Sequence, residues 1–264
     1  MSTLEVRTLS VEVGGSVVIR DLSFALHPGD KVGLVGRNGA GKTTTLKILA
    51  GEELPASGTV EVRGRVGYLR QDPRQHRADD DATGLEHILA ARGLVELARR
   101  LEKVRIQLEE DPSERNIGRF TRLEDEYRAG GGYQAESEAH AITAGLGLAS
   151  DRLGLPVGAL SGGERRRLEI ARSLTLQPSF ILLDEPFSGI DTLTVKDLQE
   201  IIRELSRAGI GVLVTDHNVR ETLNVTDRAY ILNHGKIFRA GTPEVLSADP
   251  EVRRVYLGEH FRLN

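Results

Sequence analysis

The chain has 264 residues, of which 39% are hydrophobic and 28% charged, and its formal net charge is −4. This length and apolar content suffice for a core with a subdomain, and the near-neutral charge excludes a large basic field for nucleic acid. The absence of cysteine excludes disulfides and thiolate chemistry, and it fits a reducing compartment.

The first seven residues do not have the pattern of a signal peptide, and no apolar run reaches the ~18 residues that span a bilayer. We therefore expect a cytoplasmic protein. If it acts at the inner membrane, it does so peripherally, through partner subunits.

The first 70 residues predict short β-strands around a glycine-rich loop. Two apolar–polar alternating runs are joined by Gly14-Gly15, which is typical of an antiparallel pair. The loop at 36–41 leads into a helix over 42–50, with Gly51 past its end. The expected strands cover residues 4–13, 17–26, 31–35, 59–62 and 66–69.

The middle of the chain predicts a helical insert. Apolar residues at 3- and 4-residue steps indicate one amphipathic helix over 83–110, in which Gly93 is a weak point. Further helices are expected over 113–129 and 133–146, separated by three glycines.

The last hundred residues alternate between helices and strands, which implies a parallel sheet. We expect buried strands over 180–183 and 210–215, and a hairpin of strands around residues 233–235. The expected helices cover 165–176 and 195–208, and the hairpin strands cover 228–232 and 236–240.

The glycine-rich loop matches the phosphate-binding pattern G-x-x-x-x-G-K-[ST]. Glycines let successive N–H groups point at one centre, and the following helix adds its positive dipole end. Lys42 is expected to reach the β- and γ-phosphates, and the Thr43 hydroxyl to ligate Mg²⁺. The candidate nucleotide-binding residues are Gly36, Arg37, Asn38, Gly39, Ala40, Gly41, Lys42, Thr43 and Thr44.

Two carboxylates follow the apolar run at 180–183. Asp184 is a candidate magnesium ligand and Glu185 a candidate general base that polarises the attacking water. A solvated turn after a hydrophobic strand is the simpler alternative, and the nearby phosphate loop weighs against it.

The segment Leu160-Ser161-Gly162-Gly163-Glu164 precedes a predicted helix. Ser161 is a natural N-cap, and the two glycines leave N–H groups exposed, which makes a second anion site. Standing alone, this segment would be interpreted as a plain helix cap.

In chain order the phosphate loop comes first, the segment Leu160–Glu164 second and the strand with its two carboxylates third. Three motifs in that order resemble the ABC ATPase family over essentially the whole chain. The resemblance implies a P-loop NTPase of α/β class, with a RecA-like mixed-sheet core, an N-terminal antiparallel β part and a helical subdomain. The core would comprise residues 1–73 and 175–264 and the helical subdomain residues 74–174. ATP and Mg²⁺ would be the cofactors.

Further roles follow from the same resemblance. Gln71 is similar to the glutamine that senses the γ-phosphate and Mg²⁺, and Asp191 belongs to a segment that resembles the D-loop of a dimer interface. His217 resembles the switch histidine that holds the γ-phosphate. Each ATP would lie between residues 36–44 of one copy and Ser161, Gly162, Gly163 and Glu164 of a second copy, in a head-to-tail homodimer.

The sequence departs from the family at Val13, where an aromatic residue usually stacks on adenine. Losing a base stack costs about 1–3 kcal/mol elsewhere. Weaker base binding, or a relaxed preference for ATP over GTP, is therefore expected.

The chain resembles two branches of the family. Residues 1–148 are similar to ABC-F proteins, whereas residues from Gly162 onward are similar to the ATPase of the bacterial lipopolysaccharide exporter. This mosaic favours an engineered chimera over natural divergence.

Three functions remain open. The first is the ATPase subunit of a transporter such as a lipopolysaccharide exporter, bound to membrane subunits; the others are an ABC-F-like factor on ribosomes and a stand-alone ATPase. A nucleic-acid partner is not expected, because residues 74–132 hold 11 basic and 13 acidic residues.

Overall fold

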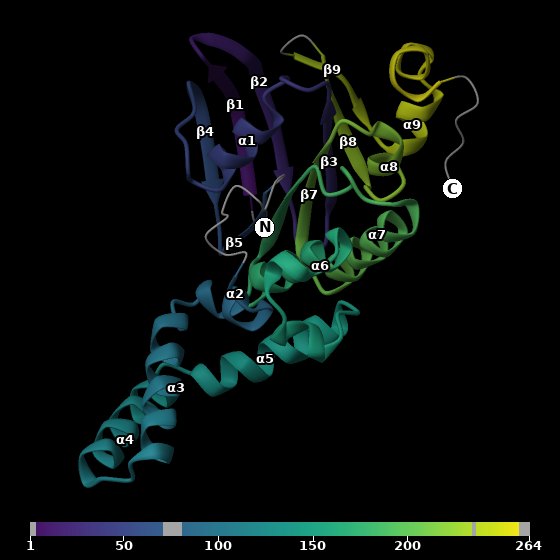
Figure 1. The fold of residues 1–264 in the computed structure, drawn as a ribbon. Coiled ribbons are helices and arrows are strands. Elements are labelled where there is room, and N and C mark those ends of the chain that lie inside the picture. Colours follow the sequence, from purple (N-terminus) through teal and green to yellow (C-terminus); the bar gives the residue numbers. More distant parts are fainter. Residues whose placement is uncertain (1–3, 71–80, 234–235, 259–264) are drawn as a thin grey trace. The chain divides into compact units, whose positions relative to one another are not determined.

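The computed structural model describes residues 4–70, 81–233 and 236–258 (Figure 1). The chain forms two compact units, one built from residues 1–73 and 177–264 and the other from residues 74–176.

The first unit begins with a small antiparallel sheet in the strand order β2-β1-β4. β1 (Leu4–Val13) pairs with β2 (Ser16–Leu26) across the turn at Gly14-Gly15, where both glycines have positive φ. β4 (Ser57–Val62) pairs with the other edge of β1.

The second sheet of this unit has six strands, in the order β5-β6-β7-β3-β8-β9. The first five strands of that order are parallel, and β9 pairs antiparallel with β8. β6 and β7 are buried along their whole length, as expected for parallel strands covered on both faces. The strand bounds are β3 (Lys31–Gly36), β5 (Val66–Leu69), β6 (Phe180–Asp184), β7 (Gly211–Asp216), β8 (Arg228–Asn233) and β9 (Lys236–Gly241).

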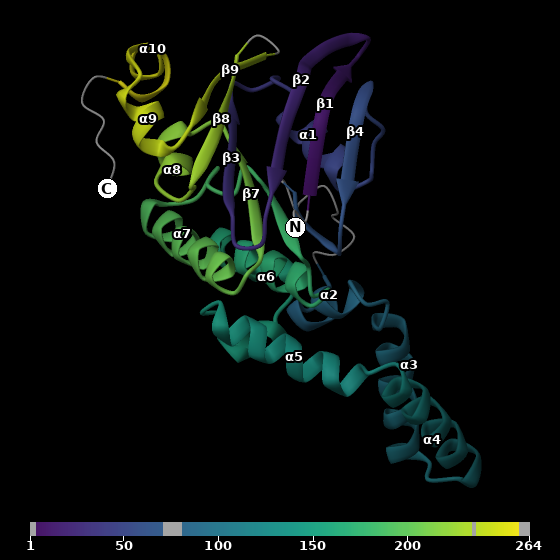
Figure 2. The same ribbon diagram turned by 180° about the vertical axis from the view of Figure 1, so that it is seen from behind.

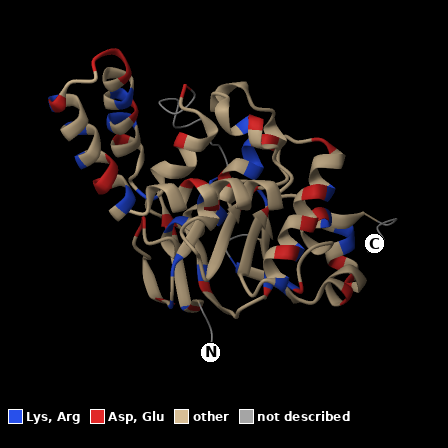
Figure 3. Cartoon of the chain, turned by 90° about the horizontal axis from the view of Figure 1, so that it is seen from below, with Lys and Arg blue, Asp and Glu red and all other residues tan. Residues whose placement is uncertain are grey.

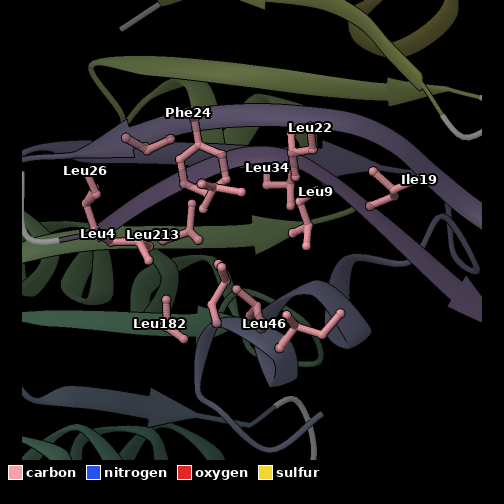
Figure 4. Close-up of a cluster of buried hydrophobic side chains, with 14 of the residues drawn as sticks. Leu4, Leu9, Ile19, Leu22, Phe24, Leu26, Leu34, Leu46, Leu182 and Leu213 are labelled. Atoms are coloured by element: carbon pink, nitrogen blue, oxygen red, sulfur yellow. The ribbon is translucent and has the colours of Figure 1, made fainter. Parts of the chain in front are cut away.

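Helix α1 (Lys42–Leu49) lies between the two sheets and contacts β1 as well as β3, β6 and β7 (Figure 1). Leucines from both sheets and from α1 meet there in one apolar cluster (Figure 4). The cluster fixes the start of α1 against the end of β3, and this places the loop between them.

Helices α7 and α8 pack on the parallel sheet through β7 and β3, and Figure 2 shows them from behind. α7 buries one stripe of apolar residues that recur at 3- and 4-residue steps. The remaining bounds in this unit are α7 (Thr192–Arg207), α8 (Val219–Leu223), α9 (Pro243–Ala248), α10 (Pro250–Val252) and the π-helical turn η4 (Arg253–Leu257).

The second unit is helical in its described part. Its core joins residues of α2, α3, α4 and α5 around the buried ring of Tyr127. Its helices are α2 (Gly84–Ala90), α3 (Val95–Glu110), α4 (Glu114–Ala129), α5 (Gly132–Gly145) and α6 (Gly162–Leu174), with 3₁₀ turns η2 (Ser150–Gly154) and η3 (Val157–Ala159).

The α/β class, the mixed sheet, the antiparallel N-terminal part and the helical insert are confirmed. The single helix expected over 83–110 is wrong, because Gly93 adopts a left-handed φ of 71° and separates α2 from α3. The helix expected from residue 165 begins three residues earlier, directly after the cap at Ser161.

Candidate functional site

Three strands of the parallel sheet end at the same edge. Val35 of β3 lies beside Asp216 of β7, and Asp184 of β6 lies beside Thr215. The phosphate loop, the carboxylates after β6 and the histidine after β7 therefore meet at the carboxyl ends of the strands, where open α/β sheets bind ligands.

The phosphate loop curls between β3 and α1 by means of left-handed glycines. Gly39 has a φ of 79° and Gly41 a φ of 87°, conformations that side chains resist. A Cβ at Gly41 would also lie 2.7 Å from Val18, so glycine is required there by space as well as by φ. Arg37, Asn38 and Gly39 form the exposed rim of the loop.

Lys42 lies inside this loop and is only 4% exposed. Its ammonium donates hydrogen bonds to the carbonyls of Gly36 at 2.9 Å and Arg37 at 3.2 Å, and it lies 3.5 Å from Oε1 of Glu185. These contacts fix a buried positive charge at the centre of the loop, within reach of a phosphate bound by the loop's N–H groups.

Asp184 is fully buried at the end of β6. Its Oδ1 accepts a 2.7 Å hydrogen bond from the Thr215 hydroxyl, whereas Oδ2 has no hydrogen-bond partner among the described residues. Burial raises the pKa of this carboxyl, and the hydroxyls of Thr215 and Thr43 act in the opposite direction. An orphaned carboxylate oxygen beside Thr43 fits a hard cation.

Glu185 follows in a strained backbone conformation, with a φ of 46°. Its N–H donates to the carbonyl of Thr215 at 2.8 Å, which fixes the turn. The side chain is buried, and its Oε2 lies 3.2 Å from Nδ1 of His217, whose side chain is 47% exposed. The carboxylate therefore lies between a buried ammonium and an imidazole.

Asp216 is a buried member of this cluster that the sequence reasoning missed. It accepts hydrogen bonds from the N–H groups of Asn218 at 2.8 Å and Phe187 at 3.4 Å, and its Oδ1 lies 3.4 Å from Nδ1 of His217. Burial raises the pKa of its carboxyl. The signal that could have revealed it is its place directly after the buried strand predicted over 210–215, which corresponds to the place of Asp184 at the end of β6.

A pocket of about 330 Å³ opens over the phosphate loop. Val13 forms part of its wall and is 48% exposed. Val13, where the family usually has an aromatic residue that stacks on adenine, therefore faces this pocket. The lining residues are Val13, Asn38, Gly39, Gly41, Lys42, Thr43, Thr44 and Glu185.

In the helical unit, Ser161 caps α6 as predicted. Its Oγ accepts from the N–H of Glu164 at 3.3 Å, while the Glu164 carboxylate accepts from the N–H of Ser161 at 2.8 Å. This hydrogen bond from the Ser161 N–H lowers the pKa of the Glu164 carboxyl, which also pairs with Arg152 at 3.1 Å. Glu164 is thus engaged in its own unit, whereas Ser161 and Gly162 are exposed.

Asp191 is the N-cap of α7 and accepts from the N–H groups of Leu193 and Thr194 and from the Thr194 hydroxyl. These bonds, the Thr194 hydroxyl first among them, lower the pKa of its carboxyl. Within this unit the residue therefore has a structural role. Gln71, expected to sense the γ-phosphate and Mg²⁺, lies outside the described residues.

Among the described residues, no group of three or more histidine or acidic side chains gathers around a metal position. The described helices include none with the length and apolarity needed to cross a bilayer.

A parallel sheet with a phosphate loop at its carboxyl edge, a buried lysine and a carboxylate pair defines a nucleotide-hydrolysing protein. The chain matches the family model for ABC transporters over residues 19–188, and it belongs to this family as an ATP-binding, ATP-hydrolysing subunit.

Two similar proteins are of the same kind. The chain is 39% identical to the lipopolysaccharide export system ATP-binding protein LptB of Escherichia coli K12, with 100% of both chains covered. It is 41% identical to a probable ABC transporter ATP-binding protein of Azorhizobium caulinodans, over 97% of this chain and 83% of the relative.

The fold also matches solved structures. An ATP-binding cassette of an ABC transporter in its ADP conformation superposes with a TM-score of 0.72 at 23% identity, covering 98% of this chain and 100% of the other. The likeness to LptB extends through both halves of the chain, so neither the ABC-F resemblance nor a chimeric origin is supported.

Proposed function

We propose that this chain energises an ABC exporter of the lipopolysaccharide-export kind, as a homodimer that binds ATP at its interface. The observation that carries this proposal is that Glu185 lies at the wall of the phosphate-loop pocket, in contact with both Lys42 and His217. The buried Asp184 directly precedes it. The choice of exporter rests on the relatives named LptB, which match this chain from end to end.

The loop N–H groups and the buried ammonium of Lys42 hold the β- and γ-phosphates. Glu185 orients the attacking water and accepts its proton, since its carboxylate lies at the pocket wall between Lys42 and His217. His217 then donates to the γ-phosphate from the exposed side of the pocket.

Thr43 and Asp184, together with Gln71, are the residues that would hold Mg²⁺. When bound, the ion would neutralise charge on the β- and γ-phosphates. The orphaned Oδ2 of Asp184 supports this assignment.

Ser161, Gly162 and Gly163 of a second copy complete each site, and Asp191 and Glu164 contribute to the same interface. The exposure of Ser161 and Gly162 supports this arrangement. Residues 1–73 and 175–264 act as the ATP-binding core and residues 74–174 as the helical subdomain. The protein works in the cytoplasm, at the inner membrane, through its membrane subunits.

Glu185→Gln tests the proposal. The amide keeps the size of the side chain but cannot accept the proton, so hydrolysis should fall by roughly 10²-fold or more while ATP still binds. Gel filtration with ATP and Mg²⁺ should then show a stable dimer, and without nucleotide a monomer. Unchanged phosphate release would exclude Glu185 as the base, and a monomer under both conditions would exclude the shared site.

A further inference from the structure

The helices α3 and α4 form an antiparallel pair whose charged side chains separate onto two faces, and Figure 3 shows both signs of charge on this pair. On one face the arginines are paired with acids. Arg105 contacts Glu102 at 2.7 Å and Glu109 at 2.5 Å, and Arg128 contacts Glu124 at 3.1 Å. With Asp125, which lies 3.9 Å from Arg128, this face holds two arginines and four acids, and it is net acidic.

The opposite face gathers five exposed basic side chains, here called the basic face: Arg100 and Lys103 of α3 with Arg115, Arg119 and Arg122 of α4. Residues three, four and seven apart share one side of a helix, so each row is continuous. A 3.4 Å hydrogen bond from Arg119 to Gln107, which follows Lys103 by one turn, joins the two rows. Within the described part of the chain, none of the five takes part in an ion pair.

The net charge of residues 74–132 does not reveal that basic residues gather on one face of α3 and α4 and acidic residues on the other. Acidic residues outnumber basic ones there, but the acids on the opposite face are used by Arg105 and Arg128. From the helical rise, the basic row on α4 is about 10 Å long and the row on α3 about 5 Å, and helices packed in this way have axes about 8–10 Å apart. Five positive charges therefore occupy a patch wide enough for one extended or helical segment.

The residues of the basic face and its surroundings argue against a lipid surface or a single-stranded nucleic acid as its binding partner. Phe120 and Tyr127 are turned into the hairpin's core, so they do not offer rings for base stacking. On α3 and α4 the large exposed apolar side chains are Ile106 and Ile117, and these two give too little apolar area to enter a membrane interface.

Acidic residues limit the basic face at both ends. By helical spacing, Glu96 and Glu126 continue its rows one turn beyond Arg100 and Arg122, and Glu110 continues the row of Lys103 toward the tip. A long, uniform polyanion such as a nucleic-acid duplex would meet these acids. A short segment with an acidic centre and basic ends would not.

We propose that the basic face docks an acidic segment of a partner protein. Four of its five residues are arginines, whose planar fork binds carboxylates through two parallel hydrogen bonds. None of the five residues lines the nucleotide pocket or takes part in the proposed hydrolysis, so the proposal stands independently of the exporter assignment.

The test uses the intact protein and a fluorescein-labelled helical peptide with glutamates at i and i+4 in its centre and lysines at its ends. Fluorescence anisotropy should show binding that weakens as salt is raised. Lys103→Gln with Arg119→Gln should weaken it about ten-fold or more, because two charge pairs are lost. Arg105→Gln with Arg128→Gln removes the same charge from the other face and should change binding less than about two-fold.

Both double variants should keep wild-type basal ATP hydrolysis and thermal unfolding, which excludes misfolding as the cause. Should the first pair unfold, Arg100→Gln with Arg122→Gln replaces it. The proposal is overturned by absence of peptide binding, by equal losses in the two variants, or by tighter and equally face-dependent binding of a 16-base-pair RNA duplex.

Discussion

At the scale of single residues, the site places acidic side chains close together in a buried position, which costs folding stability. Asp184 is fully buried beside Glu185, and one of its oxygens has no hydrogen-bond partner among the described residues. Glu185 adds a strained φ of 46°. Such features cost stability and are retained at sites where a ligand uses them.

Asp184→Asn should therefore stabilise the nucleotide-free protein. Burial raises the folded-state pKa of Asp184 above its unfolded value, so its contribution to stability falls as pH rises through the folded pKa. The variant's advantage should be absent below the usual aspartate pKa and grow toward neutral pH. A gain of about 1 kcal/mol corresponds to a Tm increase of roughly 2–4 °C in a chain of this size.

Thermal unfolding in EDTA, followed by circular dichroism between pH 4 and 8, measures this effect. Asp197→Asn, an exposed change on α7, is the control. A variant whose advantage shrinks as pH rises would contradict the assignment of burial as the dominant cause.

The phosphate-loop and carboxylate motifs predicted Lys42, Asp184 and Glu185 as site residues, and the resemblance to ABC ATPases added His217. The structure brings the segments that carry them to one edge because they follow neighbouring strands of a parallel sheet. The sequence interpretation missed Asp216, whose position after a predicted strand was visible. Its hydrogen bonds from the N–H groups of Phe187 and Asn218 depend on tertiary packing, which the sequence does not show. Nor could it predict that Lys42 would contact the loop carbonyls and Glu185 together, because those distances depend on tertiary packing.

At the scale of elements, capping and glycine conformation decide where helices begin and end. The capping boxes at Thr83 and Ser161 start α2 and α6, and the turn that contains the left-handed Gly93 separates α2 from α3. The apolar periodicity predicted one helix through Gly93, because the apolar residues before and after it keep the same spacing. Periodicity does not reveal the left-handed φ of Gly93, where the helix is interrupted.

Ser161 has both an observed role as a cap and a proposed role at the phosphates, and two substitutions separate them. Ser161→Asp keeps a capping oxygen but brings a negative charge toward a neighbour's γ-phosphate, so it should abolish ATP-driven association without loss of stability. Ser161→Ala should lose about 1 kcal/mol of stability and keep most of the association.

Urea unfolding and gel filtration with ATP and Mg²⁺, each in the Glu185→Gln background, measure the two effects. The shared-site proposal would be wrong if Ser161→Asp dimerised normally, and the capping role would be wrong if Ser161→Ala unfolded like the wild type.

At the scale of the whole molecule, the proposed site is divided between copies. Lys42→Ala removes the buried ammonium from the phosphate loop, and Ser161→Asp repels phosphate from the capped helix, so each homodimer should be inactive. In a mixed dimer, one site combines the intact loop of one chain with the intact Ser161 of the other.

Equal mixing should therefore restore up to about a quarter of wild-type hydrolysis, because about half of the dimers are mixed and one of their two sites is intact. Phosphate release, measured as a function of the mixing ratio, should peak near equal amounts of the two variants. If each copy completed its own site, every chain in the mixture would carry a defect, and activity would stay at the level of the separate variants at all ratios.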